Sequence, residues 1–146
     1  MAKINWSNTL NEEREKHYQN LGLLILRIGV ALLMLFGHGF EKLVNFGSIA
    51  SGFPDPFGIG STASLILAVF AEFFCSIAIA FGFMTRFSTI PLIITMLVAA
   101  FVIHGDDPWG KKELALMYLI PYLTILFSGP GKYSIDRMIF KKHYDA

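Results

Sequence analysis

Cysteine is almost absent from this sequence, which has a single such residue, Cys75, among 146. One cysteine excludes both an internal disulfide and a paired-cysteine redox motif. Charge is scarce too: charged residues make up 16% of the chain, whereas apolar residues make up 54%. A soluble domain of this length would expose too much surface to carry so few charges. The net charge of +1 gives no reason to expect a nucleic-acid partner.

The N-terminus lacks the pattern of a secretory signal. About twenty polar and charged residues precede the first apolar run, and no small-residue cleavage pattern follows it. We therefore expect the first apolar segment to stay in the mature protein.

Four apolar stretches dominate the rest of the chain. We expect membrane spans at about 21–40, 62–83, 87–104 and 113–128. The apolar stretch of the last, 114–127, is only 14 residues long, which covers about 21 Å of a hydrocarbon core roughly 30 Å thick. It is still expected to span, because the other three leave no water-soluble core for it to join. The predicted fold is an all-α integral membrane four-helix bundle with short loops.

The two ends of the chain are polar. Residues 1–20 are predicted to form a polar tail, and residues 129–146 a basic interfacial segment in which Ser134 caps a short helix. Outside the spans, eight Lys and Arg residues lie on the side of the termini and three on the other side. The excess of positive charge predicts that both termini are cytoplasmic.

Two charged residues interrupt the apolar spans, Arg27 in the first and Glu72 in the second. Charges inside a bilayer are unfavourable by several kcal/mol, so such residues are candidates for function. We expect Arg27 and Glu72 to pair. The pair has two interpretations: it fixes the register of two helices, or Glu72 binds a proton or a polar ligand group.

A second polar group is predicted at the outer membrane face, away from the two termini. His38 is followed three and four residues later by Glu41 and Lys42, so they share a helix face. His104 ends the third span and should reach the same depth. Histidine titrates near neutral pH and can relay protons, whereas the alternative is ordinary polar residues at helix ends. Axial haem ligation by the two histidines is the less favoured cofactor hypothesis, and no motif predicts a metal site.

Two tyrosines one turn apart on the fourth span, Tyr118 and Tyr122, are candidates for hydrogen bonds to a ligand. Packing is the alternative explanation for both. Cys75 lies one turn after Glu72 and is expected to be an inert apolar filler.

These motifs, in this order and spacing, resemble those of the DoxX family. The resemblance covers most of the chain, from about Leu21 to Arg137. It rests on Leu26-Arg27, His38-Gly39 with Lys42, the Pro- and Gly-bearing loop, Ala71-Glu72, Gly82-Phe83-Met84-Thr85-Arg86, His104-Gly105 and Gly129-Pro130-Gly131-Lys132-Tyr133-Ser134-Ile135-Asp136.

The resemblance implies a four-helix protein of the bacterial inner membrane and, as the leading hypothesis, a quinone-associated oxidoreductase component. Some members of the family are linked to quinone-coupled thiosulfate oxidation, some to quinone or catechol detoxification, and some to assemblies with soluble redox partners. Quinone is then the candidate cofactor. The expected proton-exchanging residues are Arg27, His38, Glu72 and His104, and the expected quinone-binding residues are Glu41, Lys42, Tyr118 and Tyr122.

Two rival hypotheses remain open at this stage. The first is a non-enzymatic membrane anchor or assembly subunit that recruits soluble redox partner proteins through its tails. The second is a small-molecule transporter, which four short helices could serve only as a homo-oligomer.

Overall fold

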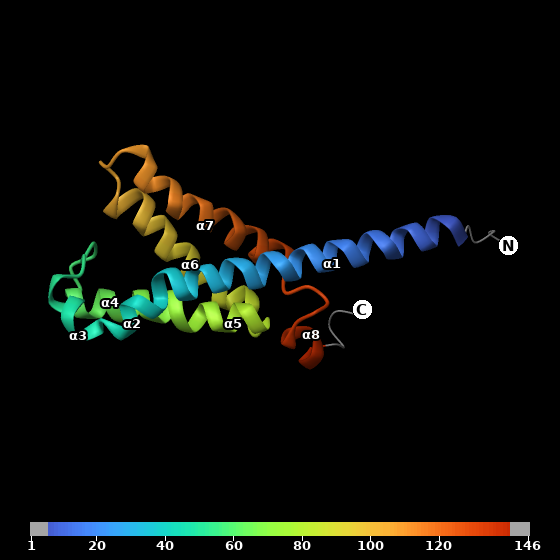
Figure 1. The fold of residues 1–146 in the computed structure, drawn as a ribbon, viewed down its shortest axis with the longest axis horizontal. Helices are drawn as coiled ribbons and strands as arrows, with labels where there is room; N and C mark the ends of the chain where they lie inside the picture. Colours follow the sequence, from blue (N-terminus) through green and yellow to red (C-terminus); the bar gives the residue numbers. More distant parts are fainter. Residues whose placement is uncertain (1–5, 141–146) are drawn as a thin grey trace.

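The computed structural model describes residues 6–140, which form helices and connecting loops without a β-strand. Figure 1 shows long helices, two of which lie side by side and are inclined to the first, and the start of the first helix and the short last helix lie towards the same end of the molecule. The predicted all-α fold is confirmed.

The first helix, α1 (Trp6–Met34), unites the polar N-terminal residues and the first apolar span. No Pro or Gly lies between Trp6 and Leu21, so nothing in the sequence ends the helix at residue 20. The helix continues through a π-helical turn, η1 (Leu35–Gly39), into α2 (Phe40–Val44). The predicted boundary at residue 20 is therefore not a structural one, and α1 extends beyond the bundle (Figure 1).

The next two spans also contain π-helical turns. The helix 61–81 is built from α4 (Ser61–Val69), η3 (Phe70–Cys75) and α5 (Ser76–Phe81). The helix 85–103 is built from α6 (Thr85–Val98) and η4 (Ala99–Ile103). Three helices of the described chain, Asn11–Val44, Ser61–Phe81 and Thr85–Ile103, are long and apolar enough to cross a membrane.

The fourth helix, α7 (Trp109–Ser128), is longer than its apolar run. The helix begins directly after Pro108, so its 20 residues cover about 30 Å at 1.5 Å per residue. Its first two turns contain the charged residues Lys111, Lys112 and Glu113. These charges set α7 apart from the three helices above. That it crosses the membrane stays a prediction.

Short elements connect the long helices. After α2 come α3 (Phe46–Ile49), η2 (Ala50–Gly52) and the predicted Pro- and Gly-bearing loop. Asp55 organises this loop by accepting hydrogen bonds from Ile59 N (3.0 Å), Gly60 N (2.8 Å) and Ser64 Oγ (2.9 Å). These bonds, above all the one from Gly60, lower the pKa of Asp55.

The predicted cap of the last helix, α8 (Ile135–Ile139), is confirmed: Ser134 Oγ accepts a hydrogen bond from Arg137 N (3.2 Å). Residues 141–146 of the predicted C-terminal segment lie outside the described residues.

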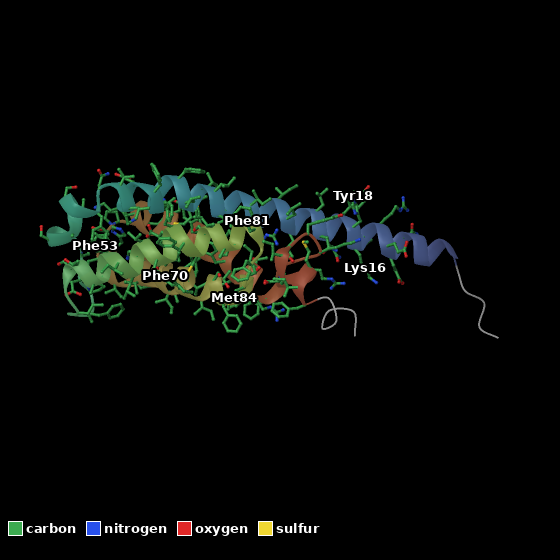
Figure 2. The ribbon with its side chains drawn as sticks, turned by 90° about the horizontal axis from the view of Figure 1, so that it is seen from below. Lys16, Tyr18, Phe53, Phe70, Phe81 and Met84 are labelled. Carbon is green, nitrogen blue, oxygen red and sulfur yellow. The ribbon has the colours of Figure 1, made fainter. Side chains whose placement is uncertain are left out.

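The bundle is apolar outside as well as inside. One buried cluster joins all four long helices through Val30, Ala31, Met34, Ala71, Cys75, Ile79, Leu92, Met96, Ala100, Ala115, Leu119, Tyr122 and Ile125. Phe70 and Phe81 lie on the outer surface, whereas Lys16 and Tyr18 lie on the extension of α1 (Figure 2). An apolar exterior along the bundle and a polar extension suit a protein embedded in lipid with one end in water.

Candidate functional site

An ion pair lies towards the end of the bundle away from the termini. Lys42 Nζ in α2 donates to Glu72 Oε2 in η3 at 2.6 Å. The Glu72 side chain is 7% exposed and that of Lys42 23%. The two helices approach closely because position 39 is glycine: a Cβ on Gly39 would lie 2.6 Å from the backbone C and O atoms of Glu72.

Two cavities, of about 310 Å³ and 180 Å³, adjoin the ion pair. Both are lined by Lys42, Glu72, Ala99 and His104. The larger is otherwise mostly apolar and reaches the loop after η2, which supplies Phe53, Pro54, Pro56, Phe57 and Ile59. The smaller adds Met34, His38, Met96, Lys111, Leu114, Ala115 and Tyr118. The buried carboxylate therefore faces space that a ligand group can fill on two sides.

His104, just after η4, belongs to a second charged group. Its Nδ1 lies 2.7 Å from Asp107 Oδ2, and Lys111 Nζ lies 3.5 Å from the same oxygen. The hydrogen bond from His104, and then the positive charge of Lys111, lower the pKa of Asp107. With Nδ1 bonded to Asp107, the other ring nitrogen, Nε2, is the one left for a ligand or proton.

Aromatic rings close the smaller cavity. The His38 and Tyr118 rings meet edge to face with centroids 5.5 Å apart, and both residues line this cavity. Tyr118 also stacks on Tyr122 at 6.4 Å. Tyr122 itself is fully buried in the core and lines neither cavity, and Glu41 is exposed and lines neither. Tyr122 and Glu41 therefore lie outside the two cavities.

The predicted pairing of Arg27 with Glu72 is wrong. Arg27 is 2% exposed, and its guanidinium donates from Nη1 to Pro130 O and from Nη2 to Tyr133 O, both at 2.6 Å. The chain after α7 folds back against α1, so backbone carbonyls supply the acceptors that an intramembrane arginine needs. Glu72 is left to pair with Lys42.

Arg27 belongs instead to a structural cluster at the end of the bundle nearest the termini. Asp136 accepts hydrogen bonds from Met84 N (2.7 Å) and Thr85 N (2.8 Å), which caps the start of α6. Asp136 N donates to Gly82 O at 2.9 Å. Gly82 has the left-handed φ of 71° and leaves no room for a Cβ beside Arg27. The sequence pattern alone gave no role to Asp136, although it lies two residues after the capping Ser134.

Five of the predicted residues, His38, Lys42, Glu72, His104 and Tyr118, therefore line the same small cavity. Among residues 6–140, no three His, Cys, Asp or Glu side chains are grouped as metal ligands.

The chain was compared with known proteins. The sequence model of the DoxX family matches residues 22–105. A protein of Haemophilus influenzae is 33% identical over 129 residues, which cover 83% of this chain and 85% of that protein. The inner membrane protein YqjF of Escherichia coli is 29% identical over 131 residues, covering 87% and 98%. A membrane protein of Mycobacterium tuberculosis, Rv3486, is 27% identical over 135 residues, covering 82% of each chain.

No solved structure matches the chain significantly. The family match spans Arg27, His38, Lys42, Glu72 and His104, and so includes most of the residues that the fold places at its two charged clusters. The relatives that match most of this chain include membrane proteins, in agreement with its three long apolar helices. The chain is a membrane protein and belongs to the DoxX family.

Proposed function

We propose that this protein is a quinone-associated component of a membrane oxidoreductase, with the quinone head group held beside Lys42 and Glu72. One observation carries the proposal: a buried ion pair lies between two cavities and is flanked by two histidines. A buried charged pair adds little net stability, so space on both sides of it is better explained by a ligand than by packing.

The residues of the smaller cavity fit a quinone head group. The two ring oxygens of a quinone accept hydrogen bonds, and Lys42, His38, His104 and Tyr118 all carry N–H or O–H groups. The Lys42 ammonium has three N–H groups, and Glu72 accepts from one of them. Lys42 therefore points towards Glu72 and keeps donors for a ligand oxygen.

The same residues form a route for protons. A bound quinone would accept two electrons and two protons on reduction, and the surrounding hydrocarbon supplies no protons. His104 lines both cavities and is bonded to Asp107, whose side chain is 35% exposed. Asp107 holds the imidazole of His104 in place. His104 then moves a proton between the partly exposed Asp107 side and the Lys42–Glu72 pair.

The electrons are proposed to come from a soluble redox partner protein or from a substrate that reacts with the quinone directly. The location that best fits the relatives is the bacterial inner membrane, as the name of the Escherichia coli protein states for that protein. The start of α1 and the short helix α8 lie towards one end of the bundle (Figure 1), and in this proposal the excess of Lys and Arg at that end places it in the cytoplasm.

The proposal is tested by extracting quinone from protein purified in mild detergent with nothing added. About one quinone per protein is expected in the wild type, with at least a tenfold loss in Glu72→Gln. The matched control is Glu113→Gln, which removes the same charge from an exposed position on α7. A wild type with only background quinone, or an equal loss in both variants, would contradict the proposal.

The second candidate function is a membrane anchor for soluble partners. It is favoured by a polar hollow of about 660 Å³ between the extension of α1 and the C-terminal segment. Its lining includes the charged or titratable residues Glu13, Lys16, His17, Lys132 and Arg137. The rings of His17 in α1 and Tyr133 in the C-terminal segment are in contact, which joins the two sides of the hollow. Such a charged recess beyond the apolar part of the bundle suits a protein surface.

The two functions differ in what they require. Quinone sensitivity of cells would be compared between Glu72→Gln and the paired change Lys16→Glu with Lys132→Glu. The quinone function predicts that only Glu72→Gln changes the sensitivity, and the anchor function predicts that only the paired change does.

A further inference from the structure

An apolar groove on the outside of the bundle runs along α1 and α7. It has a volume of about 450 Å³, and its lining contains no charged residue: Ile25, Leu26, Gly29, Val30, Leu33, Leu114, Met117, Tyr118 and Pro121. Ile25, Leu33 and Met117 are each more than 60% exposed. The groove therefore opens to the surface that faces lipid in a membrane-embedded bundle.

The groove adjoins the smaller cavity of the candidate site. Leu114 and Tyr118 line both, so the Tyr118 side chain stands between them. From Ile25 to Leu33 the groove follows α1 for about 12 Å at 1.5 Å per residue, from the middle of the helix towards His38. Its inner end thus meets the polar cavity, and the rest of its length is apolar.

We propose that the ligand of the Lys42–Glu72 site is an amphiphile with a single apolar tail, whose tail occupies this groove and which enters from the bilayer between α1 and α7. The inference rests on the proposed quinone function and adds to it the class of quinone: a long-tailed one from the lipid phase. The continuity of an apolar groove with a polar cavity matches the two halves of such a molecule.

The groove determines where the tail can lie, so a tailed quinone can place its head group in the cavity only while the groove is open. Lipid tails are as apolar as the groove, so a tail gains little hydrophobic free energy by moving from lipid into protein. The tail instead aligns the head group with the cavity behind Tyr118. A head group without a tail has another way in, through the larger cavity that reaches the loop at 53–59.

Two glycines of α1 provide a matched test. Gly29 lines the groove, Gly22 does not, and a Cβ at either position would meet no atom within 4 Å. Gly29→Phe should therefore fill the groove without disturbing the core, and Gly22→Phe is its control. Each variant in lipid nanodiscs is equilibrated with a decyl-tailed quinone or with the same quinone lacking the tail, and bound quinone is extracted and measured.

We expect Gly29→Phe to lose at least tenfold in bound decyl-quinone and to bind the tail-less quinone as the wild type does, with Gly22→Phe unchanged for both. If Gly29→Phe binds both quinones normally, or loses both equally, the tail groove is overturned while the quinone site stands. If the wild type binds neither quinone, the proposed function fails and this inference fails with it. Circular dichroism and elution volume show whether each variant is folded.

Discussion

The two ends of the bundle each bury a charged side chain, but they satisfy it differently. Arg27, near the termini, donates to two backbone carbonyls and lines none of the cavities described above. Glu72, towards the other end, accepts from the Lys42 side chain and lines two cavities. Backbone groups cannot titrate or rotate away, whereas a Lys side chain can do both. The first arrangement fixes structure, and the second leaves room for a ligand.

The largest effect is expected from Arg27→Gln. The change leaves the carbonyls of Pro130 and Tyr133 short of donors and removes the positive charge near Asp136. Loss of one partner from a buried charged network costs about 3–5 kcal/mol, so the thermal transition in detergent should fall sharply. Arg86→Gln is the control, because Arg86 is exposed and makes one long bond of 3.4 Å to Phe127 O. If Arg27→Gln and Arg86→Gln unfold at the same temperature, Arg27 does not stabilise the fold as proposed.

The next effect is expected from Gly39→Ala. The added methyl group would press on the backbone of Glu72 and Phe73 and force η1 and η3 apart, at a cost of about 1–3 kcal/mol. Gly37→Ala is the matched control two residues away, where a Cβ meets nothing within 4 Å. Stability and quinone content should both fall in Gly39→Ala and neither in Gly37→Ala. If the two variants behave alike, the close approach of the helices does not build the site.

A smaller change in stability is expected from Glu72→Gln. The Lys42 side chain is 23% exposed and can turn its ammonium group away from position 72, so the free energy of unfolding should fall by less than in Arg27→Gln. The quinone content of Glu72→Gln should nevertheless fall. In Arg27→Gln, by contrast, stability falls but the molecules that remain folded should keep their quinone. A Glu72→Gln protein as unstable as Arg27→Gln would remove the contrast between the two ends.

The smallest effect concerns Asp107. Its pKa is lowered in the folded protein, mainly by the hydrogen bond from His104, so the carboxylate stabilises the fold above its unfolded pKa of about 4. This stabilisation is lost as the pH falls from about 4 through the folded pKa. The difference in thermal transition between wild type and Asp107→Asn, measured from pH 6 to 3, should therefore shrink at low pH. A difference that grows on acidification would contradict the assigned interaction.

The family motifs divide between the two ends in a way that their order along the chain did not indicate. Leu26-Arg27, the turn at Gly82–Arg86 and the segment from Gly129 to Asp136 meet at the structural end. His38-Gly39, Lys42, Glu72 and His104 meet at the other. Two isolated intramembrane charges predict a pair between Arg27 and Glu72. Backbone carbonyls can also satisfy a buried arginine, and in this fold those of Pro130 and Tyr133 do so.

The sequence by itself determined the membrane class, the long helices and the turns between them, because hydrophobic run length and Pro and Gly positions are local properties. Only the tertiary structure decided which charges meet. The return of the chain after α7 to Arg27 and the approach of η1 to η3 at Gly39 depend on contacts between residues that are far apart in the sequence. Such contacts leave no periodic or compositional signal in a single chain.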